Sequence, residues 1–235
     1  MTEPSRIPVR TQPADTPEVW AVKSRRVLGE GRLFDYLSDE VVTPSGDTMR
    51  RDFVDHTGAV GVIAVDDDEH IIVVAQYRHP VGFRLIEPPA GLLDAEGEEP
   101  LAAAKRELAE EAGLAAEHWR VLVDVLTTPG GVNESIRIYL ARGLSAAEAP
   151  DGFEAEGEEA HMEVLRVPFQ DLLDGILTGK LQSPSLVAGV LAYAAVRGRE
   201  DMLRAPDAPW PARTQLERTR AAADPIPDAH GCTRD

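Results

Sequence analysis

The sequence lacks several features that define large classes of proteins. It has one cysteine among 235 residues, Cys232, so no disulfide can form within the chain. No apolar run reaches the roughly 18 residues that a transmembrane helix needs. Residues 1–18, MTEPSRIPVRTQPADTPE, have no apolar stretch of the kind found in secretory signals. We therefore expect a cytoplasmic protein that does not associate with membranes.

Positive charge is also scarce. The chain has 24 lysines and arginines against 41 aspartates and glutamates, a formal net charge of −17. Proteins that bind nucleic acid present a basic face, so this balance argues against a nucleic-acid partner. An anionic substrate would need bound metal and nearby arginines to reverse the field at its site.

Composition divides the chain into four parts. Residues 1–18 are rich in proline, threonine and charge, and this predicts a flexible tail. Residues 19–57 hold about three short strand-like segments separated by turn signals, which predict a small antiparallel sheet. Such a sheet is too small to be stable alone, so it should pack on the main domain or on a partner subunit. Residues 58–197 form the main domain, and residues 198–235 show no sustained pattern and predict a mostly disordered tail.

Strand and helix patterns alternate irregularly through residues 58–197. We predict strands at 59–65, 71–77, 85–87, 119–126, 136–141 and 162–167, and helices at 101–112, 169–178 and 184–197. Three aspartates at 66–68 are interpreted as a polar hairpin turn, with a metal site as the alternative. This order predicts an α+β domain in which helices pack on a mixed sheet.

The most informative stretch is residues 91–114, GLLDAEGEEPLAAAKRELAEEAGL. Its helix should begin near Pro100 and end at Gly113, a residue suited to the left-handed cap. Glu107, Glu110 and Glu111 share one face at spacings of three and four, and so repel one another. The face is either a solvated acidic surface or a site for hard divalent cations, which prefer oxygen ligands.

From Glu98 the sequence reads E-x7-R-E-L-x-E-E-x-G-L. This resembles the signature of the Nudix hydrolases, G-x5-E-x7-R-E-U-x-E-E-x-G-U, where U is aliphatic. One departure occurs, because Gly91 lies seven residues before Glu98 instead of six. The resemblance implies an α/β/α sandwich that hydrolyses a nucleoside diphosphate linked to another group.

Segments outside this signature resemble the ADP-ribose pyrophosphatase subfamily. Residues 76–94, QYRHPVGFRLIEPPAGLLD, are similar to its Q-Y-R…R…E-L-P-A-G segment, and residues 51–60 are similar to a neighbouring strand. Residues 128–134 resemble its P-G-F-S-D-E loop less well, since 131–133 all depart. The resemblance implies hydrolysis of ADP-ribose to AMP and ribose 5-phosphate by a homodimer whose small sheet contributes to the partner's site.

The same resemblance assigns roles to individual residues. Glu107, Glu110, Glu111 and the carbonyl of Ala90 would bind Mg²⁺, with Mn²⁺ as the alternative, and Arg106 would hold a carboxylate in place. The general base would be Glu159, or otherwise Glu158. Substrate would contact Arg51, Arg78, Arg84, Glu87 and Glu134, although Glu87 would equally well pair with Arg84.

Three alternatives to an ADP-ribose diphosphatase stay open. The same chemistry would serve another nucleotide sugar or a dinucleotide. A non-catalytic ADP-ribose sensor would share the fold, but the intact glutamate set and the lack of a basic helix-turn-helix argue against it. An interaction module that relies on its acidic tails would show no turnover.

Overall fold

The computed structural model describes residues 11–95, 97–148 and 161–221. Its strands are β1 (Val22–Glu30), β2 (Asp35–Val42), β3 (Thr48–Asp55), β4 (Ala59–Val65), β5 (His70–Arg78), β6 (Phe83–Glu87), β7 (Ala90–Leu92), β8 (Leu114–Leu126), β9 (Ser135–Ala146) and β10 (Glu163–Pro168). Its helices are α1 (Pro100–Ala112), α2 (Phe169–Leu177), α3 (Pro184–Val196) and α4 (Pro211–Ala221), with short 3₁₀ turns at His79–Val81 and Glu200–Met202.

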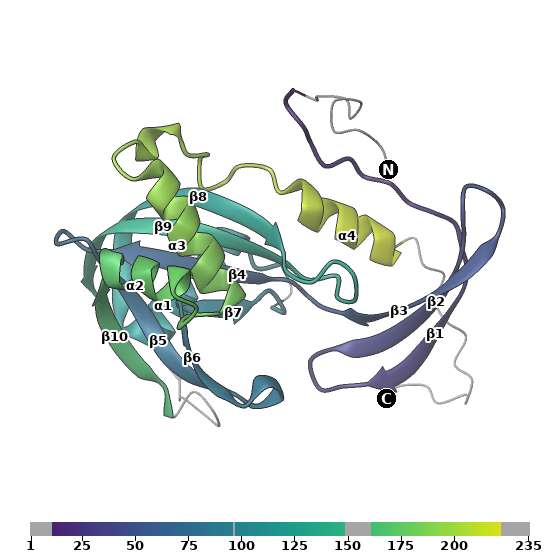
Figure 1. Ribbon diagram of the computed structural model, residues 1–235, viewed down its shortest axis with the longest axis horizontal. Coiled ribbons are helices and arrows are strands. Elements are labelled where there is room, and N and C mark those ends of the chain that lie inside the picture. The colour runs from purple at the N-terminus through teal and green to yellow at the C-terminus, as the bar shows by residue number, and fades with distance from the viewer. Residues whose placement is uncertain (1–10, 96, 149–160, 222–235) are drawn as a thin grey trace.

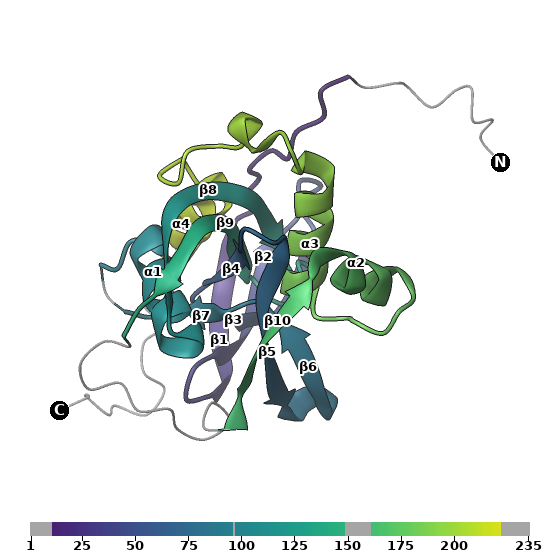
Figure 2. The same cartoon turned by 90° about the vertical axis from the view of Figure 1, so that its left-hand side faces the viewer.

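The main sheet is mixed. Its path runs β10-β5-β4-β9-β8, with β6 paired to β5 and β7 paired to β4. The β4–β9 pair is parallel, whereas β8–β9 and β5–β10 are antiparallel. Figure 2 shows α1 on one face of this sheet and α2 with α3 on the other.

Strand β4 lies at the centre of the sandwich, and all seven of its residues are buried. Ala59, Ile63 and Val65 belong to the core cluster that also holds residues of α2 and α3. Val60, Val62 and Ala64 belong to the opposite cluster, which holds residues of α1. Because successive strand residues point to opposite faces, one apolar run supplies both layers of core. The predicted α/β/α sandwich is confirmed.

Helix α1 agrees closely with the sequence prediction. It begins at Pro100, and Gly113 caps it with φ of 64° while its N–H bonds the carbonyl of Ala109. Several strands extend beyond their predicted bounds, β8 and β9 by the most. Strands β8 and β9 continue their antiparallel pairing to Leu114 and Ala146, through alanine-rich segments that have little strand preference of their own.

The predicted three-stranded antiparallel sheet is also present, in the order β1-β2-β3. It stands to one side of the main sheet in Figure 1. The hydrogen bonds Val54 N–H to Gly131 O (2.9 Å) and Asn133 N–H to Val54 O (3.2 Å) join β3 to the loop between β8 and β9. The small sheet therefore packs on its own main domain through this loop.

The segment after residue 198 differs from the predicted disordered tail. Helix α4 forms there and lies between the two sheets (Figure 1), and Trp210 just before it is 6% exposed. The helix carries few apolar residues, so its sequence shows no amphipathic period, and tertiary contacts order it instead. Residues 222–235 lie outside the described part of the chain. Among the described helices, none has the length and apolar character needed to cross a bilayer.

Candidate active site

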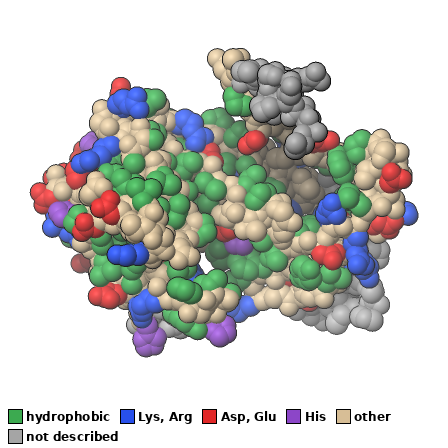
Figure 3. All heavy atoms as spheres, viewed as in Figure 1, with side chains coloured by type: hydrophobic (Ala, Val, Ile, Leu, Met, Phe, Trp, Pro, Cys, Tyr) green, Lys and Arg blue, Asp and Glu red, His purple; other side chains and the backbone are tan. Residues whose placement is uncertain are grey.

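A pocket of about 790 Å³ opens between the main sheet, α1 and the loop joining β1 to β2. Figure 3 shows the molecule hollowed between its main body and the small sheet. Eight of the predicted site residues line the pocket: Arg78, Glu87, Ala90, Arg106, Glu107, Glu110, Glu111 and Glu134. A second hollow, of about 600 Å³ on the small sheet, contains none of the predicted residues.

Two predicted arginines lie elsewhere. Arg51 is exposed on β3, and its guanidinium donates to the carbonyl of Arg50 at 3.0 Å. Arg84 donates to the carbonyls of Ala75 (2.8 Å) and His161 (3.1 and 3.2 Å), so it fastens the start of β10 to β5 and β6. Neither lines the pocket of its own chain. Glu158 and Glu159 lie outside the described residues.

The glutamates of α1 face the short strand β7. A Cβ built on Gly91 would stand 1.8 Å from Oε1 of Glu107, so the carboxylate fills space that only glycine leaves open. Glu111 accepts a hydrogen bond of 2.9 Å from the N–H of Ala90 through Oε2. One turn of helix thus places two carboxylates against one strand, because residues four apart share a face.

Arg106 forms ion pairs with three carboxylates of this region. Its guanidinium donates to both oxygens of Glu98 at 2.9 and 3.0 Å, to Glu107 at 2.7 Å and to Glu110 at 2.8 Å. The bond to Arg106 lowers the pKa of Glu98, and the three carboxylates raise the pKa of Arg106. Arg106 therefore makes an i,i+4 ion pair with Glu110 and also contacts Glu107, and it anchors the entry loop through Glu98.

The donor set fits a divalent cation. Glu98, Glu107, Glu110 and Glu111 share this region with one guanidinium, so negative charge exceeds positive charge. Carboxylate and carbonyl oxygens are the ligands that hard cations prefer. A cation held by the α1 glutamates and the carbonyl of Ala90 would offset the excess charge.

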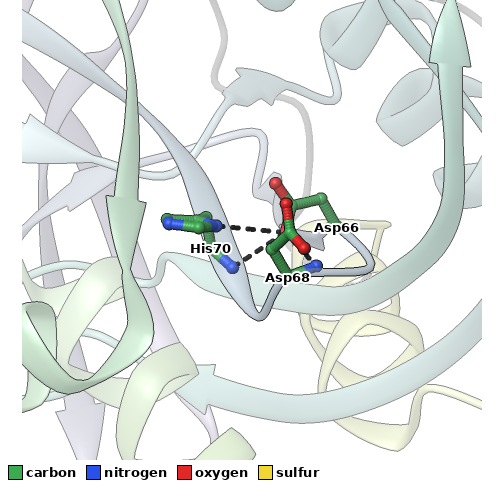
Figure 4. Close-up of side chains that lie close together, drawn as sticks. All are labelled: Asp66, Asp68 and His70. Carbon is green, nitrogen blue, oxygen red and sulfur yellow. Dashed lines mark hydrogen bonds and ion pairs between the residues drawn. The ribbon is translucent and has the colours of Figure 1, made fainter.

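A second group of carboxylates has a simpler explanation. Asp66, Asp68 and His70 are the one group of three potential ligands within 4.8 Å of one another that the described residues contain (Figure 4). Asp66 accepts bonds of 2.9 Å from the N–H groups of Asp68 and His70, and Arg166 pairs with both aspartates. None of these residues lines the pocket, and the arrangement is that of the predicted hairpin turn.

Glu87 lies on the wall of the pocket, and its partner there is not Arg84. It is 8% exposed and accepts bonds from Arg78 Nε at 2.9 Å and Ser183 Oγ at 3.1 Å. The predicted alternative partner, Arg84, is engaged with backbone carbonyls instead. Arg78 is the last residue of β5 and pairs with Phe83 of β6, so the register of these two strands, which the sequence left open, decides this pairing.

Sequence reasoning missed an aromatic and histidine pair in the pocket. The rings of Phe34 and His56 stack with centroids 4.2 Å apart and planes 15° apart. His56 Nε2 lies 3.3 Å from Glu134 Oε1, and the hydroxyl of Thr127 donates to the other oxygen of Glu134. The position of His56 in the matched segment 51–60, next to the strand that enters the site, was a usable signal.

Comparison with known proteins places these features in a family. The sequence profile of the NUDIX domain matches residues 55–186. The chain belongs to the Nudix family. The hydrolases of this family use divalent metal ions, in agreement with the oxygen-donor set on α1.

Curated Nudix relatives cover most of the chain. The ADP-ribose pyrophosphatase of Mycobacterium tuberculosis is 43% identical over 187 residues, which are 80% of this chain and 89% of that protein. The GDP-mannose pyrophosphatase of Enterobacter is 29% identical over 172 residues, 69% of this chain and 87% of that protein. A crystal structure of an ADP compounds hydrolase superposes with a TM-score of 0.65 at 21% identity, covering 79% of this chain and 98% of that one. This last likeness supports the fold alone.

Proposed function

We propose that this Nudix hydrolase cleaves the pyrophosphate of ADP-ribose with Mg²⁺, releasing AMP and ribose 5-phosphate. The observation that carries the proposal is the convergence of Glu107, Glu110 and Glu111 with Ala90 on one wall of a pocket. The similarity to the ADP-ribose pyrophosphatase of M. tuberculosis supports the choice of substrate.

The reaction replaces one P–O bond of the pyrophosphate by a bond to water oxygen. Mg²⁺, or Mn²⁺ in its place, would neutralise phosphate charge and make the bound water more acidic. Glu107, Glu111 and the carbonyl of Ala90 would hold it, with Glu110 contributing. Glu159, or otherwise Glu158, remains the predicted group that takes the proton from water.

The remaining residues would fix the substrate. Arg78 presents guanidinium N–H groups into the pocket, and guanidinium suits phosphate oxygens. Glu87 and Glu134 offer carboxylates that can accept hydrogen bonds from ribose hydroxyls. Arg84 would act indirectly, since it holds the carbonyl of His161, which is two positions after Glu159 in the sequence.

A panel of substrates tests the proposal. The purified protein is incubated with Mg²⁺ and one of four substrates: ADP-ribose, NADH, UDP-glucose or GDP-mannose. The released phosphomonoester is then measured. We expect the highest kcat/KM for ADP-ribose. A higher value for GDP-mannose would favour the second candidate, another nucleotide-sugar diphosphatase, which the Enterobacter relative and the departures at 131–133 support.

We further propose a homodimer in which Arg51 serves the partner's pocket. The small sheet exposes apolar side chains, among them Leu28 at 44% and Tyr36 at 45%, and Arg51 does not line its own pocket. Analytical ultracentrifugation tests the dimer. A cytoplasmic location stays a prediction.

Mixing two inactive variants tests the shared site. If Arg51 acts across the interface, Arg51→Ala mixed and re-equilibrated with Glu111→Gln forms hetero-dimers with one intact site each. About a quarter of wild-type activity should then return, since half of the dimers are mixed and each has one of two sites intact. No recovery in a verified mixture would contradict the shared site.

A further inference from the structure

The described C-terminal residues form a strap, residues 203–221, that begins on the main sheet. Arg137 of β9 is 2% exposed, and its guanidinium pairs with Asp124 at 2.8 and 3.0 Å. The same group donates to the carbonyls of Ala208 (2.7 Å) and Pro209 (3.0 Å) and lies 4.8 Å from the ring centroid of Trp210. A buried cation thus fixes the middle of the strap.

The far end of the strap reaches the small sheet. Arg220 donates through Nε to Asp55 Oδ1 at 2.8 Å and through Nη2 to the carbonyl of His56. The same Asp55 oxygen accepts a bond of 2.6 Å from Asn133 Nδ2. Asn133 Oδ1 in turn accepts the N–H of His56 at 2.7 Å. Both backbone groups of His56 are therefore held, one by the strap and one by the β8–β9 loop.

The side chain of His56 transmits this constraint to the pocket. Its Nδ1 accepts a bond of 3.0 Å from the N–H of Gly58, so in the neutral ring the proton is on Nε2. Nε2 faces Glu134 Oε1 at 3.3 Å, while Phe34 stacks on the ring. Burial lowers the pKa of His56, although Glu134 opposes this, and the neutral ring is favoured.

We infer that Arg220 is a positioning residue, which holds His56 and Asn133 so that the carboxylate of Glu134 faces the substrate. This inference rests on the proposed function for its effect on ADP-ribose. It also gives a role to one departure from the subfamily loop. Position 133 departs from the P-G-F-S-D-E loop of the subfamily, and the side chain of Asn133 links Asp55 to the backbone of His56.

Kinetics and binding of three variants test the role. In Arg220→Ala we expect KM for ADP-ribose, and its Kd measured by calorimetry without metal, to rise about tenfold, which is about 1.4 kcal/mol. The kcat should change by less than about twofold, because the α1 carboxylates are untouched. Arg220→Lys should recover part of the loss, since an ammonium can still bond Asp55. Arg218→Ala, an exposed arginine of the same helix, is the matched control and should behave as wild type.

A double-mutant cycle separates positioning from general loosening. Asp55→Asn and Arg220→Ala act on one hydrogen-bonded unit, so the rise in KM of the double variant should be well below the product of the two single effects. Multiplicative effects, or an equal rise in Arg218→Ala, would overturn the inference. An unchanged KM and Kd in a folded Arg220→Ala protein would also overturn it.

Histidine NMR provides a readout that does not need hydrolysis. Asp55, Glu134 and Arg220 are the charged groups that act on His56, and Arg220 lowers its pKa. Arg220→Ala should therefore raise the pKa of His56, whereas Arg218→Ala should not. If the wild type hydrolyses none of the nucleotide sugars, the proposed function fails, but this titration still tests whether Arg220 acts on His56. An unchanged pKa of His56 in Arg220→Ala would contradict the inference.

Discussion

The carboxylate of Glu107 occupies the space beside Gly91 that any larger residue would need. A Cβ at position 91 would meet Glu107 Oε1 at 1.8 Å, Cδ at 2.1 Å and Cγ at 2.6 Å. Glycine at position 91 is therefore needed to keep the Glu107 side chain in this position. The missing side chain at position 91 lets a helix carboxylate and a strand backbone come close enough that both would reach one cation.

Gly91→Ala should impair catalysis more than folding. The clash is with a flexible side chain, so Glu107 would swing aside while the backbone stays in place. We expect kcat with Mg²⁺ to fall about 10- to 100-fold, the range for a displaced metal-site group. The thermal midpoint should change little. Gly29→Ala is the control, because a Cβ there meets nothing within 4 Å; an equal loss in both variants would contradict the packing argument.

Acid stability should depend on Glu69. Burial by itself would raise its pKa, but Tyr193, Arg142 and Arg197 donate to it and hold the pKa at about 2, against an ordinary value of 4.5. The unfolded state therefore binds the extra proton between these values, so this contribution to stability is present above pH 4.5 and is lost as pH falls towards 2.

Urea unfolding of Glu69→Gln at several pH values measures this contribution. The difference in free energy of unfolding between wild type and variant should be largest near pH 6 and shrink as pH falls from 4.5. Glu117→Gln, whose side chain is 77% exposed, should show no such trend. A difference that is independent of pH would contradict the assigned pKa.

Trp210 should contribute to stability although it lies in a segment of low apolar content. It is 6% exposed and belongs to the core cluster beneath α1. Trp210→Ala should lower the free energy of unfolding by about 3 kcal/mol, as for other buried aromatics. Trp20→Ala, at a site 39% exposed, should cost much less. Equal losses in chemical denaturation would show that the strap is not packed as described.

The parts of the fold that could be predicted are those with a strong local signal. Strand β4 is a continuous apolar run, and α1 has helix formers between Pro100 and Gly113. The spacing of Glu107, Glu110 and Glu111 also sufficed to place them on one face, and the structure brings all three to the pocket.

The parts that could not be predicted depend on contacts between distant residues. Helix α4 is held by the contact between Arg137 and Trp210, and its sequence has no periodic apolar pattern that would predict packing against the main domain. Arg78 and Arg84 both belong to the matched segment. The register of β5 and β6 places them on opposite faces of the sheet, and only Arg78 lines the pocket. The role of His56 depends on Asn133, 77 positions away along the chain.

The most direct test of the central claim compares wild type and Glu111→Gln on ADP-ribose with Mg²⁺. The glutamine can still accept the bond from Ala90 N–H through its amide oxygen, so the fold should persist while a charged metal ligand is lost. We predict that wild type releases AMP and ribose 5-phosphate in equal amounts and that kcat falls about 100-fold or more in the variant. Near-equal turnover by a folded Glu111→Gln, or no AMP from the wild type, would contradict the account.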